Sequence, residues 1–245
     1  MSLLSVVQAV NRRVGVSAIN LSAVTSASDI SILQLWELAN EEGQELAGRY
    51  AWQALQKEAT FTTVGTQVQG TIQTITGPDF AYVFNDTMWD RTTRRPVFGP
   101  RPPHEWQQLM AQTMQGPYLQ YRIRQNQLIL LPNPPTTGDS VFFEWQSKYW
   151  CAKSDASGPS DQYNLDTDIA FLDERLIRLG LIWRYKKAKG LPYQADQAVY
   201  EGAVLDAITR DAAKPNLNLN GSKADLYPAI LVPAGNWPIS GEPSA

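Results

Sequence analysis

Apolar residues recur at helical spacing near both ends of the chain and at alternating spacing between them. Ser28 and Asp29 are typical of a helix N-terminus, and the apolar residues after them follow at intervals typical of one helix face. These residues are Ile32, Leu35, Trp36, Ala39, Leu46, Ala47, Tyr50 and Ala54. The pattern predicts one long amphipathic helix that runs to Ala54, and a shorter helix over residues 3–13 precedes it.

The period changes between Thr60 and Trp150. Thr and Val dominate residues 60–76, where Val64, Val68 and Ile72 are spaced as in a half-buried strand. A second short strand is predicted over residues 80–84, after the Gly77-Pro78 stop. One helix, over residues 103–112, interrupts the region, and its Pro-Pro start suits a helix N-terminus.

Residues 118–145 hold the clearest strand signals. Residues 118–131 predict a hairpin that turns near Gln125-Asn126, and a turn-rich loop over residues 132–139 leads to a further strand. In each strand, alternate positions place apolar side chains on one face. They are Leu119, Tyr121 and Ile123 in the hairpin, then Val141, Phe143 and Trp145.

Helical spacing returns after a linker at residues 154–162. Leu172, Leu176, Leu179 and Trp183 form one stripe, which stops at Gly190 and Pro192. A second helix, over residues 193–212, follows the stop. Its predicted apolar face consists of Ala198, Leu205, Ile208 and Ala212. The two segments predict a helical hairpin.

The order of these segments predicts an α+β fold. The N-terminal and C-terminal helices pack together into one bundle, and an antiparallel β domain, followed in sequence by the C-terminal helices, is inserted between them. None of the 16 prolines precedes Pro78, nine lie from Pro78 to Pro135, and five lie from Pro215 to Pro243. The last segment therefore reads as an extended arm. The expected boundaries are 1–58 for the N-terminal helices, 59–160 for the β domain, 161–213 for the hairpin and 214–245 for the arm.

Composition removes several classes of protein. The chain has 245 residues and a net charge of −3, and its single Cys151 and single His104 exclude an internal disulfide and a structural zinc site. The sequence has no run of 18 apolar residues, and the order of charged and apolar residues at its start does not favour a signal peptide, so a membrane contact is not expected. Charged residues make up 18% of the chain, below the roughly 25% of an ordinary protein. A low fraction of charged residues favours an assembly subunit, in which neighbouring subunits cover part of the surface.

Catalytic motifs are sparse as well. A histidine-dependent scheme would have to use His104, which the Pro102-Pro103 context places at the surface, where a helix opens. No glycine-rich phosphate loop is present. Paired carboxylates remain an alternative, because a cell-wall hydrolase needs two of them. The candidates are Asp86, Asp90, Glu105 and Glu144. We predict no enzyme activity, no catalytic or metal-binding residue and no cofactor.

Basic residues gather in two places. One group lies in the central region, at Arg91, Arg94, Arg95 and Arg101. The other lies on the first helix of the C-terminal hairpin, at Arg175, Arg178, Arg184, Lys186, Lys187 and Lys189. A solvated face or ion pairs to a neighbouring acidic subunit would explain the second group. Contact with a nucleic-acid backbone, independent of sequence, is the other interpretation.

The arm is the more specific feature, since it spaces apolar residues among prolines that forbid a helix. The residues expected to bind a partner are Leu217, Leu219, Tyr227, Ile230, Leu231 and Trp237. A free tail would be polar and poor in aromatic residues. The arm therefore either folds back on its own domain or binds a partner by strand addition or in a groove.

An ordered series of segments resembles the head-tail adaptor, or connector, proteins of tailed bacteriophages. The likeness covers most of residues 28–210 and is carried by the following residues. They are the run Leu35-Trp36-Glu37-Leu38-Ala39-Asn40-Glu41-Glu42-Gly43-Gln44-Glu45-Leu46 with Trp52, the run from Leu128 to Pro135, Gly138-Asp139, Phe143-Glu144-Trp145, Asp166-Thr167-Asp168, Leu176-Ile177, Gly180-Leu181, Trp183-Arg184 and the turn from Lys189 to Tyr193.

The resemblance implies a structural virion protein at the head-tail interface, made in the host cytoplasm. It implies a dodecameric ring that docks on the portal protein, receives a downstream tail or nozzle protein, and leaves a channel through which double-stranded DNA passes without sequence-specific contacts during DNA ejection. A tail-completion protein of the same assembly, or a muralytic enzyme of the virion, are the alternatives.

Overall fold

The structure, a computed structural model, describes residues 2–16, 21–112, 116, 118–133, 135–155 and 157–211. One compact unit spans Met1–Asp211, and the remaining residues, 212–245, lie outside the described part. The helices are α1 (Leu3–Val14), α2 (Ile30–Arg49), the 3-10 turn η1 (Gln53–Leu55), α3 (Ile72–Thr76), α4 (Pro103–Ala111), α5 (Glu174–Ala188) and α6 (Gln194–Asp211). The α+β class is confirmed.

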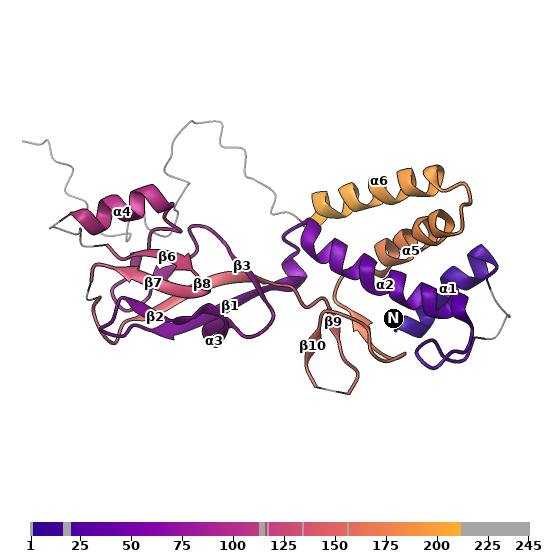
Figure 1. Ribbon diagram of the computed structural model, residues 1–245, viewed down its shortest axis with the longest axis horizontal. Coiled ribbons are helices and arrows are strands. Elements are labelled where there is room, and N and C mark those ends of the chain that lie inside the picture. Colours follow the sequence, from indigo (N-terminus) through magenta and orange to yellow (C-terminus); the bar gives the residue numbers. More distant parts are fainter. Residues whose placement is uncertain are drawn as a thin grey trace, which may run out of the picture. The chain divides into compact units, whose positions relative to one another are not determined.

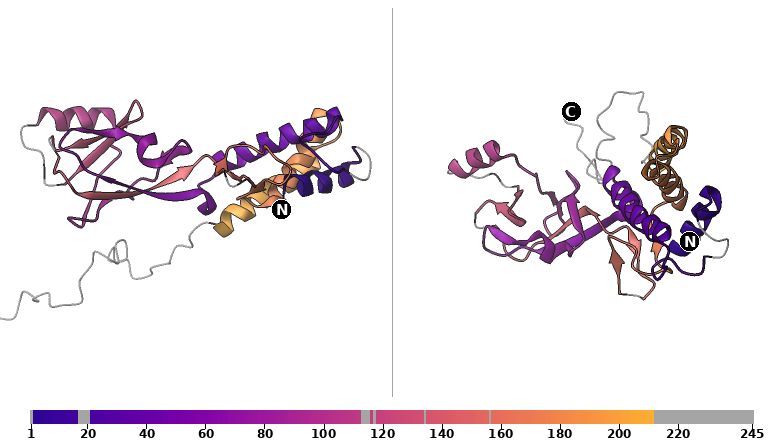
Figure 2. Two further views of the ribbon diagram at one scale, coloured as in Figure 1. Left: turned by 90° about the horizontal axis from the view of Figure 1, so that it is seen from below. Right: turned by 45° about the vertical axis from the view of Figure 1, so that its right-hand side comes forward.

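The four long helices come from opposite ends of the chain and pack on one another. Helix α5 contacts α1, α2 and α6, which lie side by side with it in Figures 1 and 2. Their shared hydrophobic core joins α1 and α2 to α5 and α6, which follow the β region in sequence. Residues 3–55 and 150–208 therefore fold as one body, as the sequence predicts.

Helix α2 begins where its sequence predicts and ends early. The Asp29 carboxylate accepts a hydrogen bond from the Ser31 N–H and caps the first turn. The helix stops at Arg49, and Tyr50 is extended. The prediction that the helix runs to Ala54 is therefore wrong by about one turn. Trp52 turns back instead, and its Nε1 donates to the Leu46 carbonyl oxygen at 2.6 Å.

The inserted region contains two antiparallel sheets around a second core. β8 (Ser140–Ser147) pairs with β1 (Gln56–Thr62), β3 (Phe80–Val83) and β4 (Trp89–Asp90), and β4 pairs with β5 (Arg95–Pro96). The other sheet has the order β2-β7-β6, from β2 (Val68–Thr71), β7 (Gln127–Leu131) and β6 (Gln120–Arg124). Val141, Phe143 and Trp145 of β8 and Tyr121 of β6 belong to the same core.

The predicted hairpin and the strand after it are confirmed. Gln125 and Asn126 both adopt positive φ, which a two-residue hairpin turn requires, and β6 and β7 pair on either side of them. Both faces of β7 are buried. Leu128 and Leu130 face the sheet-on-sheet core, whereas Ile129 and Leu131 pack with Trp106 of the predicted helix α4.

The strand predicted over residues 60–76 is wrong in its second half. The chain leaves β1 at Thr62, returns as β2, and then forms the one-turn helix α3 from Ile72. The Thr71 side chain accepts a hydrogen bond from the Thr74 N–H and starts that turn. Ile72 is buried, but Val64 and Val68 are exposed. Every-fourth spacing is shared by strands and helices, so the pattern did not separate them.

The predicted linker at residues 154–162 is partly ordered into a small sheet. β9 (Cys151–Ala152) pairs with β10 (Pro159–Ser160) and with β11 (Ile169–Ala170). Trp150 and Tyr163 lie in the helical core, where their rings pack edge to face with the ring centroids 4.7 Å apart. The helical body therefore resumes soon after β8 ends at Ser147, rather than at residue 161.

Asp166 and Asp168 lie in the loop before α5, where the Asp166 carboxylate joins this loop to the segment after α1 and the Asp168 carboxylate holds the loop itself together. Asp166 accepts hydrogen bonds from the Val24 and Thr25 N–H groups, and its carbonyl oxygen accepts one from Leu4. The fully buried Asp168 carboxylate accepts from the backbone N–H groups of Ser154, Asn164 and Leu165 and from the Ser154 hydroxyl. Burial alone would raise the pKa of Asp168, but these hydrogen bonds outweigh it and hold the pKa below its ordinary value of 3.8.

We expect Asp168→Asn to lower the free energy of unfolding by about 1–2 kcal/mol, because one amide oxygen cannot accept all four hydrogen bonds. Asp161→Asn, a control in the same loop, should change it by less than about 0.5 kcal/mol. Urea unfolding measures both. Since the folded pKa is depressed, the Asp168 contribution should be complete above about pH 4 and lost as the pH falls further. Equal losses in both variants would contradict the role given to Asp168.

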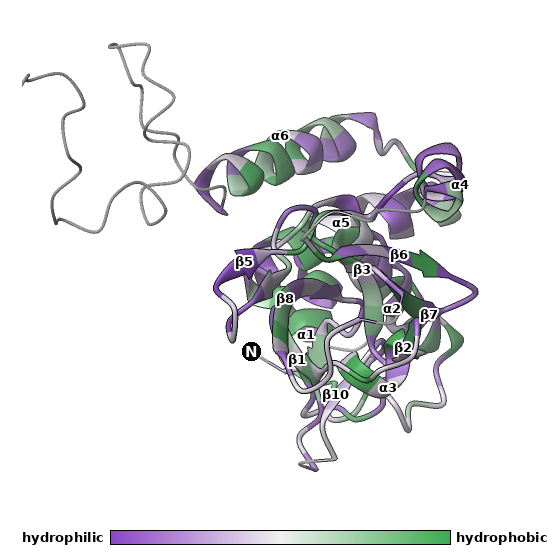
Figure 3. Cartoon of the chain, turned by 90° about the vertical axis from the view of Figure 1, so that its left-hand side faces the viewer, coloured by the Kyte–Doolittle hydropathy of each residue, from purple (hydrophilic) through white to green (hydrophobic). Residues whose placement is uncertain are grey.

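The C-terminal hairpin is confirmed, but the predicted face of its second helix is only partly right. Tyr200, Ala203 and Val204 face the core of the bundle, and Ile208 packs against it as predicted. Ala198 and Leu205, predicted on the same face, are exposed, and Leu205 keeps 62% of its surface accessible. Ala212 lies outside the described residues. Helix α6 carries apolar residues on more than one side (Figure 3), so two faces were compatible with its spacing. In the described part of the chain, no helix is both long and apolar enough to cross a bilayer.

Candidate interaction surface

The six basic residues predicted on the first helix of the hairpin, five in α5 and Lys189 just after it, do not form one surface. Arg184 faces the core, where its side chain is 10% exposed, and Lys186 makes an ion pair with Asp196 of α6. Lys187 and Lys189 lie at the exposed end of the helix, over the rings of Trp183 and Tyr185. Arg175 and Arg178 remain, and they line a groove. The interpretation of Arg184 as a DNA or neighbour contact is therefore wrong.

Arg184 serves instead to balance a buried carboxylate. Its Nε lies 2.5 Å from Oε2 of Glu42, a fully buried residue of α2, and its other nitrogens pair with Glu41 and Glu45. Burial raises the pKa of Glu42 above its ordinary value of 4.5 despite this partner. Burial and the nearby Glu42 carboxylate likewise raise the pKa of Tyr200. Glu42 of α2 is fully buried and contacts Arg184 of α5 and Tyr200 of α6, so the cluster holds α2 against α5 and α6.

The groove lies along α5 between α1 and α6, and we call it the α1–α5–α6 groove. Its cavity has a volume of about 390 Å³. The residues that line it are Ala9, Val10, Arg13, Arg175, Arg178, Leu179, Ile182 and Val199. Arg13 and Lys186 both pair with Asp196, which ties α1 and α5 to α6. The groove thus combines an apolar floor with cationic walls.

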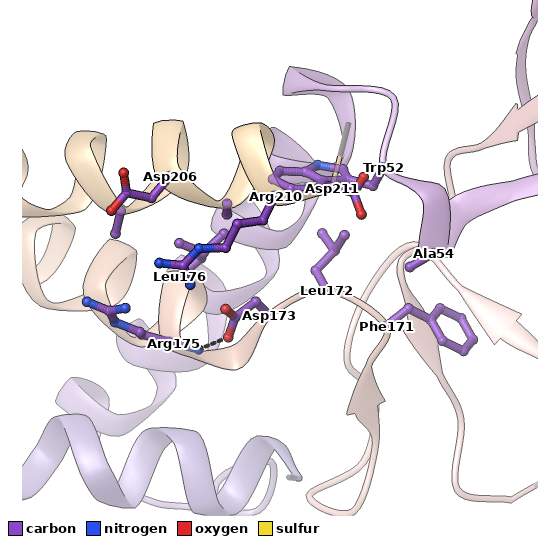
Figure 4. Close-up of a pocket in the computed structure, with 12 residues that line it drawn as sticks. Trp52, Ala54, Phe171, Leu172, Asp173, Arg175, Leu176, Asp206, Arg210 and Asp211 are labelled. Carbon is purple, nitrogen blue, oxygen red and sulfur yellow. Dashed lines mark hydrogen bonds between the residues drawn. The ribbon is translucent and has the colours of Figure 1, made fainter. Parts of the chain in front are cut away.

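A second cavity of about 290 Å³ continues from Arg175 toward Trp52, and Figure 4 shows it. Asp173, whose carboxylate accepts a hydrogen bond from the Arg175 N–H, lies there with Asp206, Arg210 and Asp211. Asp211 is already used, because it accepts a hydrogen bond from the Gln53 N–H. The residues that line this second cavity include three aspartates and two arginines, whereas the residues that line the groove include three arginines and no carboxylate.

The remaining sequence candidates do not meet in either cavity. Asp90 is buried and accepts hydrogen bonds from Thr92 and Thr93, which makes it a turn-capping residue. Glu105 pairs with Arg101, and Glu144 is exposed on β8. The side chain of His104 is 80% exposed near the start of α4, as predicted. These positions give no support to a paired-carboxylate site.

Metal and thiol chemistry find no support in the described residues. No group of three or more His, Cys, Asp or Glu side chains there could hold a metal ion. Cys151 is buried on β9, and burial, with the nearby Asp168 carboxylate, raises its pKa to about 12. The thiol therefore stays protonated and packs as a small apolar residue.

Only part of the groove is visible in the sequence. Arg175 and Arg178 belong to the predicted basic group, but Arg13 and Val199 lie on other helices, and only packing brings them to α5. The predicted arm, with Leu217, Leu219, Tyr227, Ile230, Leu231 and Trp237, lies outside the described residues. No protein-family model matches the chain, and a search of curated proteins finds no match.

Proposed function

We propose that this chain is a structural subunit of a phage head-to-tail adaptor, a homo-oligomeric ring that docks on a portal protein and passes double-stranded DNA to a downstream tail or nozzle protein. The proposal places it in the virion, at the head-tail interface, without catalysis. The observation that carries it is the fold: terminal helices packed into one bundle, with an antiparallel β region inserted between them in the sequence, which is what the resemblance implies.

The residues that carry the resemblance also have physical roles in this fold. Trp36 donates its indole N–H to the Tyr163 carbonyl oxygen at 2.9 Å, and Asn40 accepts the Tyr163 N–H at 2.7 Å. The Asp166 carboxylate accepts a hydrogen bond from the Thr25 N–H, Asp168 holds its own loop together, and Arg184 balances Glu42. Part of the similar series thus makes contacts within the bundle, and another part, with Phe143 and Trp145, lies in the β core. These roles support a shared architecture.

A fold can host many functions, so the proposal also depends on a surface suited to contact. Helix α6 leaves Val199 56% and Leu205 62% exposed, and the α1–α5–α6 groove adds two arginines without carboxylate partners in the described part of the chain. Apolar residues beside arginine are typical of protein interfaces. This surface supports an assembly subunit.

We expect the purified protein, mixed with its portal protein, to form rings of matching symmetry in negative-stain electron microscopy. A variant that lacks residues 214–245 should stay folded, because the cores described above are built from residues 3–208. That variant should no longer join portal rings in a pull-down. Rings that never form would contradict the adaptor function, whereas docking by the truncated protein would contradict only the role of the arm.

A further inference from the structure

We propose that the bundle carries both halves of a head-to-tail contact between copies of this chain, in which the acidic outer face of α2 on one copy enters the α1–α5–α6 groove of the next. We define that face by Ile30, Glu37, Leu38 and Glu41. The inference rests on the proposed function, because it names the contact that would build the ring.

Two of the three arginines that line the groove have no carboxylate partner in the described part of the chain, whereas the third, Arg13, pairs with Asp196. Arg175 is exposed and Arg178 is half-buried. A carboxylate brought in by another molecule would pair with these two guanidinium groups. Leu179 and Ile182, in the same lining, would accept an apolar side chain.

The acidic outer face of α2 offers that chemistry. Glu37 is exposed and makes no ion pair within the described residues, and Glu41, one turn later, keeps 62% of its side chain exposed although it also pairs with Arg184. Ile30 at the start of the helix is 80% exposed, and Leu38 is half-buried against the bundle core. Glutamates four residues apart and arginines three residues apart both repeat at about 5–6 Å. Acidic and apolar rows on α2 thus match the cationic and apolar rows of the groove.

The two surfaces lie on different sides of the bundle. Gly180 of α5 faces Glu42 of α2, whereas Ile182 lines the groove. Two residues turn a helix by about 200°, so α2 and the groove occupy opposite sides of α5. On α2, Glu37 is five residues from Glu42 and points about 140° away from it. A contact between two different surfaces repeats from copy to copy and closes into a ring, whereas a two-fold dimer would need one surface to match itself.

A second copy suits this groove better than DNA does. Phosphate contacts require exposed cations on a hydrated surface. The α1–α5–α6 groove instead has Leu179, Ile182 and Val199 between its arginines, and a phosphate backbone has no apolar group that would bury them. An amphipathic acidic helix laid in a groove satisfies both features.

Charge reversal in the full-length protein tests the contact. We expect Arg178→Glu and Glu37→Arg each to raise the concentration needed for half-assembly by about tenfold or more, measured by sedimentation velocity, because each places like charges together. The double variant, which inverts the pair, should assemble nearly as the wild type does. An equimolar mixture of the single variants should also assemble, because every contact in an alternating ring is again between opposite charges. Arg124→Glu and Glu144→Arg, reversals of exposed residues in the β region, are the matched controls.

Each result decides the proposal. Single variants that assemble like the wild type, or a double variant no better than either single, would show that the two surfaces do not meet. If removal of residues 214–245 abolishes self-association while Glu37→Arg does not, the arm and not α2 fills the groove. Rings insensitive to both reversals would leave the adaptor function standing and this contact wrong. A wild type that forms no ring, alone or on its portal, would overturn both. Circular dichroism confirms that each variant is folded.

Discussion

Replacing Arg184 with methionine should lower the free energy of unfolding by about 3–5 kcal/mol, because it leaves the Glu42 carboxylate buried without its cation. Glu42 is fully buried, and Nε of Arg184 lies 2.5 Å from it. In a domain of this size the loss corresponds to a fall in melting temperature on the order of 10 °C. Differential scanning calorimetry and urea unfolding measure it.

Two further variants separate the buried charge from lost packing. Arg49→Met removes another arginine that links α2 to the C-terminal hairpin, but the Arg49–Glu201 pair is partly exposed. Its loss should cost less than about 1 kcal/mol. The double variant Glu42→Met/Arg184→Met should recover most of the stability lost in Arg184→Met, since a buried ion pair can be replaced by apolar residues of similar volume. A double variant as unstable as the single would show that shape, not charge, matters here.

The pH dependence of Arg184→Met follows from the same carboxylate. Burial already raises the pKa of Glu42 in the wild type, and removing Arg184 takes away the cation that opposes this shift. A carboxyl group with a raised folded pKa favours the folded state at low pH and loses that advantage as the pH rises through the folded pKa. The stability difference between variant and wild type should therefore shrink as the pH falls from 7 toward 5. A constant difference would contradict a charged Glu42.

Local signals were sufficient for the elements whose contacts are local. The hairpin at Gln125-Asn126 and the alternation of Val141, Phe143 and Trp145 were predicted correctly, because adjacent strands and a two-residue turn fix both. Capping at Asp29 likewise placed the start of α2. The Gly190 stop separated α5 from α6, since Gly190 adopts the positive φ that ends a helix.

The errors arise where tertiary packing chooses between local options. Helix α6 has two apolar faces, and contact with α5 buries Tyr200 rather than Leu205. Ile72 fits a strand or a helix, and the cap at Thr71 decides it. The role of Arg184 could not be read from α5 alone, because its carboxylates lie on α2, some 140 residues away in sequence. The groove depends in the same way on Arg13 and Val199, which only the bundle brings to α5.

Gly43 shows how closely the two ends of the chain are fitted, and Gly43→Ala should lower the free energy of unfolding by about 3 kcal/mol. A Cβ at this position would overlap the indole ring of Trp150. The ring cannot move aside easily, because it is fully buried and its Nε1 donates to the Asp161 carbonyl oxygen at 2.7 Å. It also packs edge to face with the Tyr163 ring. The added methyl group must therefore push α2 away from Trp150 and the segment that links β8 to β9.

Gly48→Ala, in the same helix, is the matched control. No atom lies within 4 Å of a Cβ at this position, so the substitution adds helix propensity without a clash and should stabilise the protein by up to about 1 kcal/mol. Chemical unfolding of both variants should give changes of opposite sign. Equal stabilisation would mean that Trp150 does not pack against α2 as described. A loss confined to Gly43→Ala would show that the glycine is needed because an indole from the other half of the chain occupies the space beside it.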